Sequence, residues 1–148
     1  MKALIQRVAR GSVKIDDKPH AQIGRGYVIF LGVCEEDTKK DVTKLVDKIV
    51  NLRIMSDEYG KMNCSILETK GEILLVSQFT LCADCKKGRR PSFIHAMKPE
   101  KSKRLYEYMG QELAKTEVRV QTGVFGAMMD VEIINDGPVT ILLDSQTL

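Results

Sequence analysis

Polar side chains that could take part in catalysis follow an apolar run in the middle of the chain. The run 73–76 leads into a segment made up of Ser77, Gln78, Phe79, Thr80 and Leu81. The hydroxyl and amide groups of this segment could line a reactive pocket, or they could bond to nearby backbone where a strand leaves the core. A threonine nucleophile needs an adjacent base, and His20 and His95 lie in no recognisable catalytic motif. The residues alone favour the structural role.

A second polar segment interrupts an apolar pattern near the end of the chain. Asn135-Asp136-Gly137-Pro138 lies between the apolar runs 129–134 and 139–143. Asp-Gly between two apolar runs is an ordinary hairpin signal, so we expect two strands joined at 135–137. Gly137 has no side chain and would let a ligand approach the backbone closely, and the bond before Pro138 could be cis.

A basic cluster lies between these two segments. It consists of Lys86, Lys87, Arg89 and Arg90, interrupted only by Gly88. The whole chain has 23 basic and 20 acidic residues and a net charge of +3, which permits contact with nucleic acid but does not require it. A run of like charges is usually a solvated loop. The alternative is a loop that binds phosphate groups, in which Gly88 supplies backbone freedom.

The chain has four cysteines, which are Cys34, Cys64, Cys82 and Cys85. In an intracellular protein they are expected to be reduced thiols. Cys82 and Cys85 have the spacing of half a zinc site, but a structural site needs four ligands and the sequence offers no matching second pair. We therefore expect no metal site, and interpret this pair as local variation.

Motifs of several enzyme classes are missing from the chain. It has no GxxxxGK[ST] phosphate-binding loop, no GxGxxG after a strand and no HExxH helix. The acidic cluster Glu35-Glu36-Asp37 precedes a predicted helix, where negative charge complements the helix dipole. These observations exclude many enzyme classes and identify none.

The length and the hydrophobic pattern predict a single α+β domain. The chain has 148 residues, 43% of them hydrophobic, and no apolar stretch approaches the roughly 20 residues that cross a membrane. A strand-like pattern starts at once, so we expect no secretory signal and a soluble cytoplasmic protein. The predicted strands are 1–9, 12–15, 20–23, 27–33, 73–76, 118–121, 129–134 and 139–143.

Two amphipathic helices are predicted between these strands. Residues 42–52 place apolar side chains at helical spacing, and Asp37 or Thr38 can cap the start. The second helix begins near Pro99, a residue that suits the first turn. Its apolar face is expected to consist of Leu105, Tyr108, Met109 and Leu113.

The two polar segments, in this order and at this separation, resemble those of the D-aminoacyl-tRNA deacylases, also called D-tyrosyl-tRNA deacylases. The resemblance also includes the opening residues 1–8, the segment 86–93 and the run Gly123-Val124-Phe125-Gly126-Ala127-Met128-Met129, so it spans the chain. It implies a curved, barrel-like sheet with two helices, in one domain covering residues 1–148.

The resemblance implies that Ser77, Gln78, Phe79 and Thr80 line the catalytic pocket. Because no base can be named for Thr80, we expect the main-chain N–H groups of Phe79 and Thr80 to hold the carbonyl oxygen as negative charge develops on it. An aminoacyl ester is already activated, and the family implies that the substrate's own ribose 2′-hydroxyl assists the attacking water.

The resemblance also implies how substrates are chosen. Gly137 and Pro138 correspond to the Gly-cisPro pair of the family, a backbone wall that rejects L-amino acids by their Cβ atoms. Arg7 corresponds to a position that braces this loop. Phe125 corresponds to a position that stacks on the terminal adenine of tRNA, and Gly126 and Met129 belong to the same wall. The basic cluster is expected to contact the acceptor stem.

The implied function is hydrolysis of D-aminoacyl-tRNA, and of glycyl-tRNA, to free tRNA and amino acid, as translation quality control without a metal or cofactor. The family implies a homodimer in which the Gly-cisPro loop of one subunit enters the pocket of the other. The alternative is a non-catalytic RNA-binding module that uses the basic cluster, with salt-dependent affinity and no turnover. That alternative leaves both polar segments unexplained.

Overall fold

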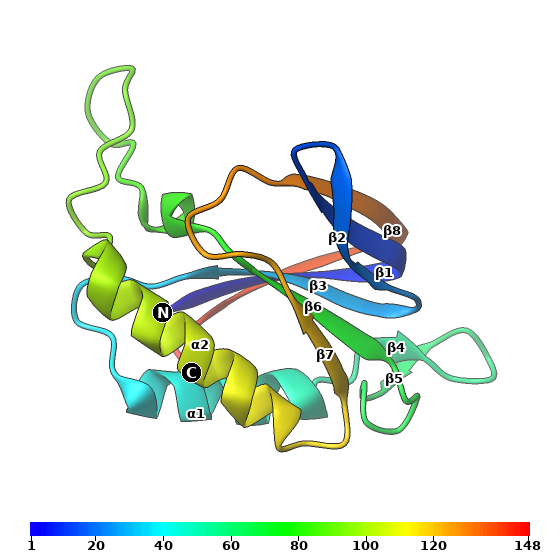
Figure 1. The fold of residues 1–148 in the computed structure, drawn as a ribbon. Coiled ribbons are helices and arrows are strands. Elements are labelled where there is room, and N and C mark those ends of the chain that lie inside the picture. The colour runs from blue at the N-terminus through cyan, green and yellow to red at the C-terminus, as the bar shows by residue number, and fades with distance from the viewer.

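The long first strand organises the sheet, as the computed structural model of residues 1–148 shows (Figure 1). Strand β1 (Lys2–Ile15) pairs antiparallel with β8 (Asp130–Asp144) along one side. On its other side, the first half of β1 pairs with β3 (Gly26–Gly32), and the second half pairs with β2 (Lys18–Ile23). Three strands therefore pair with β1, one on one side and two on the other.

The remaining strands extend the sheet in parallel. Strand β6 (Glu72–Ser77) pairs with β3, and β7 (Arg119–Thr122) pairs with β6. The order is β2-β1-β3-β6-β7, with β8 on the free side of β1. The sheet curls so that β2 also lies against β6 and β7. The predicted α+β fold with a curved, barrel-like sheet is confirmed.

Both helices cover one face of the sheet (Figure 1). Helix α1 (Lys39–Asn51) starts with a capping box between Thr38 and Asp41, which satisfies N–H groups that have no partner within the helix. Helix α2 (Pro99–Ala114) has Pro99 in its first turn, as expected. Neither helix combines the length and the apolar character needed to span a membrane.

The face of α2 that packs on the sheet differs slightly from the prediction. Tyr106, Met109 and Leu113 are buried, whereas Leu105 and Tyr108 are only half-buried. The shorter elements are β4 (Met55–Ser56), β5 (Met62–Cys64) and the 3₁₀ helix η1 (Phe79–Cys82).

The apolar core lies on both faces of the central strands. Tyr27, Ile29 and Leu75 point toward the helices and form the larger cluster with them. Val28 and Leu74 point into the concave side of the sheet and belong to a smaller cluster. Burial on both faces explains why β3 and β6 are continuous apolar runs rather than alternating ones.

Two strand predictions were wrong because each expected break lies within a continuous strand. Residues 1–9 and 12–15 form one strand, and the segment 135–137 lies within β8 instead of turning a hairpin. On both sides of that segment β8 pairs with the same partner, since Thr140 lies opposite Gln6 and Asn135 lies opposite Val8. Residues 136–139 therefore form a bulge opposite Arg7, and the strand continues in the same direction.

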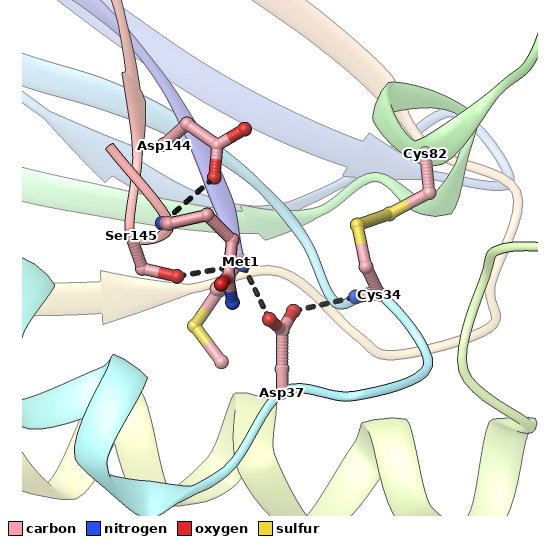
Figure 2. The surroundings of a disulfide bond; sticks show 7 residues. Met1, Cys34, Asp37, Cys82, Asp144 and Ser145 are labelled. Atoms are coloured by element: carbon pink, nitrogen blue, oxygen red, sulfur yellow. Dashed lines mark hydrogen bonds and ion pairs between the residues drawn. A yellow bond between two sulfur atoms is a disulfide. The ribbon is translucent and has the colours of Figure 1, made fainter. Parts of the chain in front are cut away.

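The expectation of four reduced thiols was wrong for Cys34 and Cys82, which form a disulfide (Figure 2). Strands β3 and β6 are parallel, and Leu31 lies opposite Ser77, so the segments that follow them leave the same edge of the sheet. This brings the two Cα atoms to 5.9 Å across a sequence separation of 48. Cys64 and Cys85 stay free, and in this state Cys82 has no thiolate to share with Cys85 as a zinc ligand.

The acidic cluster before α1 contains a carboxylate, Asp37, whose contacts the sequence did not predict. Thr38, not Asp37, caps the helix. The Asp37 carboxylate is buried, contacts the amino group of Met1 and accepts a hydrogen bond of 2.6 Å from the Cys34 N–H (Figure 2). It therefore fixes the segment that follows β3.

Candidate active site

The segment that follows β6 is held at its start by strand β3. Ser77 still lies in the ladder opposite Leu31, and the Gln78 N–H donates to the Leu31 carbonyl at 2.8 Å. The chain then turns into η1, which packs on Gly32 so closely that a Cβ there would lie 2.8 Å from Leu81 Cβ. Phe79 and Thr80 are thereby placed at the exposed start of η1.

Two N–H groups at the start of η1 have no hydrogen-bond acceptor in the protein. Within this turn the Leu81 N–H donates to the Gln78 carbonyl at 3.2 Å and the Ala83 N–H to the Thr80 carbonyl at 3.1 Å. The N–H groups of Phe79 and Thr80 donate to no protein atom, as is usual for the first residues of a helix. Adjacent free donors of this kind can bind an anionic oxygen.

The side chain of Thr80 lacks the partners of a nucleophile. Its hydroxyl oxygen accepts a hydrogen bond from the Gln78 amide, and no histidine or carboxylate bonds to it. The ring of Phe79 is 55% exposed and meets Phe93 edge to face at 5.0 Å. The pair of rings provides an apolar surface beside the free N–H groups.

The segment 123–129 begins beside the same end of β6. Strands β6 and β7 are parallel with Leu75 opposite Thr122, and the Gly123 N–H donates to the Leu75 carbonyl at 2.9 Å. Phe125 is half-buried against the core, and Gly126 has a φ of +79° with open space around it. Met129 Sδ packs on Gly123.

A buried tyrosine supports both of these segments from α2. The Tyr106 hydroxyl lies 2.9 Å from the Leu75 carbonyl and 3.3 Å from the Gly123 carbonyl, and its ring lies 5.8 Å from that of Phe125. Burial raises the pKa of Tyr106 to about 12. The phenol is therefore a hydrogen-bond donor at neutral pH, not a base.

The bulge that contains Gly137 and Pro138 is built around Arg7. This arginine is only 6% exposed, and its guanidinium donates to the carbonyls of Asp136 at 3.2 Å and Ile54 at 2.8 Å. Asn135 closes the base of the bulge by donating to the carbonyls of Arg7 at 2.8 Å and Val139 at 3.1 Å. The Gly137–Pro138 bond is cis, and both residues are exposed.

The basic cluster lies in a separate projecting loop. All four side chains are exposed, and Gly88 has a φ of +72° with nothing within 4 Å of its Cβ position. An antiparallel bridge between Asp84 and Ser92 closes the loop at its base. Figure 1 shows this loop extending away from the sheet, beyond η1.

The structure brings η1 and the segment 123–129 together, but it separates them from the Gly137 bulge. The bulge lies beside Arg7, and Arg7 pairs with Tyr27 near the start of β3. Helix η1 comes soon after Ser77, which lies opposite Leu31 near the end of β3. Tyr27 and Leu31 are four residues apart, which corresponds to about 13 Å along the strand. The two polar segments of the sequence therefore lie at opposite ends of β3.

Several residues that shape these segments were not identified from the sequence. Tyr106 donates to the carbonyls of Leu75 and Gly123, which lead into the two segments. Phe93 packs on Phe79, and Asn135 and Ile54 form hydrogen bonds with Arg7. Their partners lie far away along the chain, so no local pattern points to them. Asn135 and Phe93 carried a signal, since they belong to the polar segment in the last strand and to the segment 86–93.

Comparison with known proteins identifies similar chains over the full length. The family model described as D-Tyr-tRNA(Tyr) deacylase matches residues 4–144. The D-aminoacyl-tRNA deacylases of a Nitratiruptor species and a Sulfurihydrogenibium species are 57% and 55% identical over 148 residues, covering 100% of both chains in each pair.

Two solved structures have the same fold. One, described as c-Myc DNA Unwinding Element Binding Protein, is 44% identical with a TM-score of 0.92, and the match covers 97% of this chain and 98% of that one. The other, described as a probable eukaryotic D-amino acid tRNA deacylase, is 17% identical with a TM-score of 0.85, covering 96% and 97%. The second likeness concerns the fold alone.

The contacts of Arg7 predict that lysine cannot replace it. Arg7→Lys should lower the free energy of unfolding by about 2 kcal/mol, because a single ammonium cannot reach the carbonyls of both Asp136 and Ile54. Arg10→Lys is the matched control, since Arg10 lies on the same strand, is 54% exposed and pairs with Glu132 of β8. It should change stability by no more than about 0.5 kcal/mol. Urea unfolding measures both; equal losses would contradict the bracing geometry.

Proposed function

The chain belongs to the D-Tyr-tRNA(Tyr) deacylase family, and from this premise we propose that it hydrolyses the ester bond of D-aminoacyl-tRNA to free tRNA and D-amino acid. The family's members are hydrolases that act on ester bonds, so the alternative of a non-catalytic RNA-binding module is set aside. The observation that carries the proposal is the pair of free N–H groups on Phe79 and Thr80, at an exposed turn.

In the proposed mechanism the substrate carbonyl oxygen sits on these two N–H groups. Water adds to the carbonyl carbon and loses a proton, the N–H groups stabilise the resulting oxyanion, and collapse of the intermediate expels the ribose oxygen, which takes up a proton. The substrate's 2′-hydroxyl assists the attacking water. Ser77 and Gln78 shape the pocket, and Gln78 holds the Thr80 hydroxyl. Because an ester is an activated acyl group, oriented dipoles suffice without a nucleophilic side chain.

We propose that Gly137 and Pro138 select the substrate by excluding side chains. A rigid backbone wall close to the substrate's α-carbon leaves no room for the Cβ of an L-amino acid, whereas a D-amino acid directs its side chain away. Glycine has no Cβ, so glycyl-tRNA is accepted as well. Because the wall consists of backbone, many D-amino acids are expected to be substrates. Arg7 supports the wall through its bonds to the bulge.

We propose a homodimer, and the positions of the two segments support it. Within one chain the bulge is at the opposite end of β3 from η1, so it reaches a pocket at η1 only in a second copy. Strand β8 pairs only with β1, and its unpaired edge exposes Ile134 and Leu142. An exposed edge strand with apolar side chains is suited to association with another chain.

The tRNA end is proposed to lie between η1 and the segment 123–129. Phe125 would stack on the terminal adenine, with Gly126 and Met129 completing that wall. Lys86, Lys87, Arg89 and Arg90 would contact phosphates of the acceptor stem from their projecting loop. The proposed role is cytoplasmic quality control before the ribosome uses the mischarged tRNA.

Single-turnover hydrolysis of D-tyrosyl-tRNA and L-tyrosyl-tRNA, with a chelator present, tests the function and the oxyanion site together. Wild type should cleave only the D-ester. Thr80→Ala should lower that rate by less than about tenfold, because the proposed N–H donor is retained. Loss of a true nucleophile would cost about 10⁴-fold or more. A loss of that size with tRNA binding intact would reject the oxyanion role, and no cleavage by wild type would reject the function.

The wall predicts that Gly137→Ala reduces chiral discrimination. At a φ of +126°, the new Cβ would lie 2.8 Å from Val139 Cγ2 and 3.0 Å from Arg7 Nη2, so the bulge must move. The ratio of D-ester to L-ester cleavage rates should fall by at least about tenfold. Gly60→Ala is the control, since its φ is +75° and nothing lies within 4 Å. An unchanged ratio in Gly137→Ala would place the wall elsewhere.

The basic cluster predicts a change in the salt dependence of tRNA binding. Exchanging Lys87 and Arg89 for glutamine should reduce the slope of log affinity against log salt by about 1.5, since each phosphate contact contributes about 0.7–0.9. The control exchanges Lys40 and Lys48 for glutamine, two exposed lysines of α1. Filter binding between low and moderate salt gives both slopes. Equal slopes in the two variants would leave the cluster as a solvated loop.

A further inference from the structure

We propose that the Cys34–Cys82 disulfide positions η1 for catalysis, so that the rate of ester hydrolysis depends on the oxidation state of this pair. The inference rests on the proposed function of the Phe79 and Thr80 N–H groups. Cys82 is the last residue of η1, which begins at Phe79. The covalent bond is therefore two residues from Thr80.

Helix η1 has few other attachments. It has only four residues, of which Phe79 and Thr80 are exposed and Leu81 is half-buried, while Cys82 is 3% exposed. A helix of this length is not stable by itself. The other contacts of η1 include the Gln78 N–H just before it on the Leu31 carbonyl, the packing of Leu81 on Gly32 and the ring of Phe79 on that of Phe93. Cys82 is thus the one fully buried anchor of η1.

The other end of the disulfide is firmly held. The Cys34 N–H donates to the buried Asp37 carboxylate at 2.6 Å (Figure 2). On either side of Cys34, the Met97 N–H donates to the Val33 carbonyl at 3.0 Å and the Glu35 N–H donates to the His95 carbonyl at 2.9 Å. The bond therefore ties a weakly held helix to a fixed segment. Breaking it leaves η1 with non-covalent contacts only.

The disulfide is reachable from one side. Cys34 is half-buried and lines an open cleft of about 290 Å³ together with Asp37, His95 and Asp144. Cys82 is a buried residue, so the route for a small thiol is the Cys34 side of the bond, which faces this cleft. Thiol–disulfide exchange requires this access for the attacking thiolate.

The reduction is a two-electron exchange with a low-molecular-weight dithiol. Its thiolate attacks the sulfur of Cys34, the Cys34–Cys82 bond breaks, and Cys82 leaves as a thiolate that takes up a proton. The second thiol of the reductant, as its thiolate, then displaces Cys34 from the mixed disulfide. The protein gains two thiols, and the reductant becomes a disulfide. In reducing compartments, protein disulfides usually form transiently and act in catalysis or redox sensing.

The test compares the full-length protein in two redox states. One sample is purified without reductant, and the other is treated with excess dithiothreitol that is then removed under argon. Alkylation and intact mass should count two free thiols in the first state, Cys64 and Cys85, and four in the second. Single-turnover cleavage of D-tyrosyl-tRNA should be at least about tenfold slower after reduction, because a displacement of about 1 Å can cost about 10²-fold, while tRNA affinity changes less than about twofold.

Amide hydrogen exchange of residues 79–82 is measured in the same two states. Faster exchange after reduction supports the restraint of η1 by the disulfide. If neither state cleaves the ester, only the proposed function is rejected. Equal cleavage rates together with equal exchange would overturn the inference, and so would four free thiols after exposure to a mild oxidant.

Two cysteine variants separate the disulfide from other thiol effects. Cys34→Ser changes the half-buried partner, and it should cleave at the slow rate of the reduced protein and no longer respond to dithiothreitol. Cys85→Ser, three residues beyond Cys82 and exposed, should keep the wild-type rate and the response. If Cys85→Ser no longer responds to dithiothreitol, the response depends on Cys85 and not on the disulfide, and the inference is overturned.

Discussion

Strand β1 must be paired on both sides along its length, and the rest of the structure depends on this requirement. Its fourteen residues include several that are completely buried, so their backbone groups have no access to water and need partners in neighbouring strands. Three strands supply them, β8 on one side and β2 and β3 on the other. This pairing curls the sheet and gives the helices one face to cover.

The bulge in β8 is a consequence of the same pairing. Because β8 pairs with β1 before and after residues 136–139, the extra residues are pushed out of the ladder instead of reversing the chain. Arg7 lies opposite the gap, where its guanidinium donates to the Asp136 carbonyl and the Asn135 amide donates to the Arg7 carbonyl. A buried charge is stable only when such partners are present, so Arg7 and the bulge depend on each other. Burial raises the pKa of the neighbouring Tyr27, and the Arg7 charge opposes that rise.

The site itself follows from strands that are parallel. β3, β6 and β7 run in the same direction, so the segments after all three leave one edge of the sheet and meet there. This explains why η1, the segment 123–129 and the segment that contains Cys34 are neighbours although they are far apart in the sequence. It also explains why the bulge, at the start of β3, belongs to the other end of the molecule.

The sequence by itself determined the class of fold, most of the strands, the start of each helix and the two polar segments, because these depend on local patterns of apolar residues and caps. It also pointed to the family, through motifs whose spacing is preserved along the chain. Only the tertiary structure decided that β8 is continuous, that Arg7 is buried, that Tyr106 supports two segments and that Cys34 pairs with Cys82. Each of these is set by strand register or by the packing of a helix on the sheet, which joins residues that are distant in the chain and leaves no local signal in the sequence.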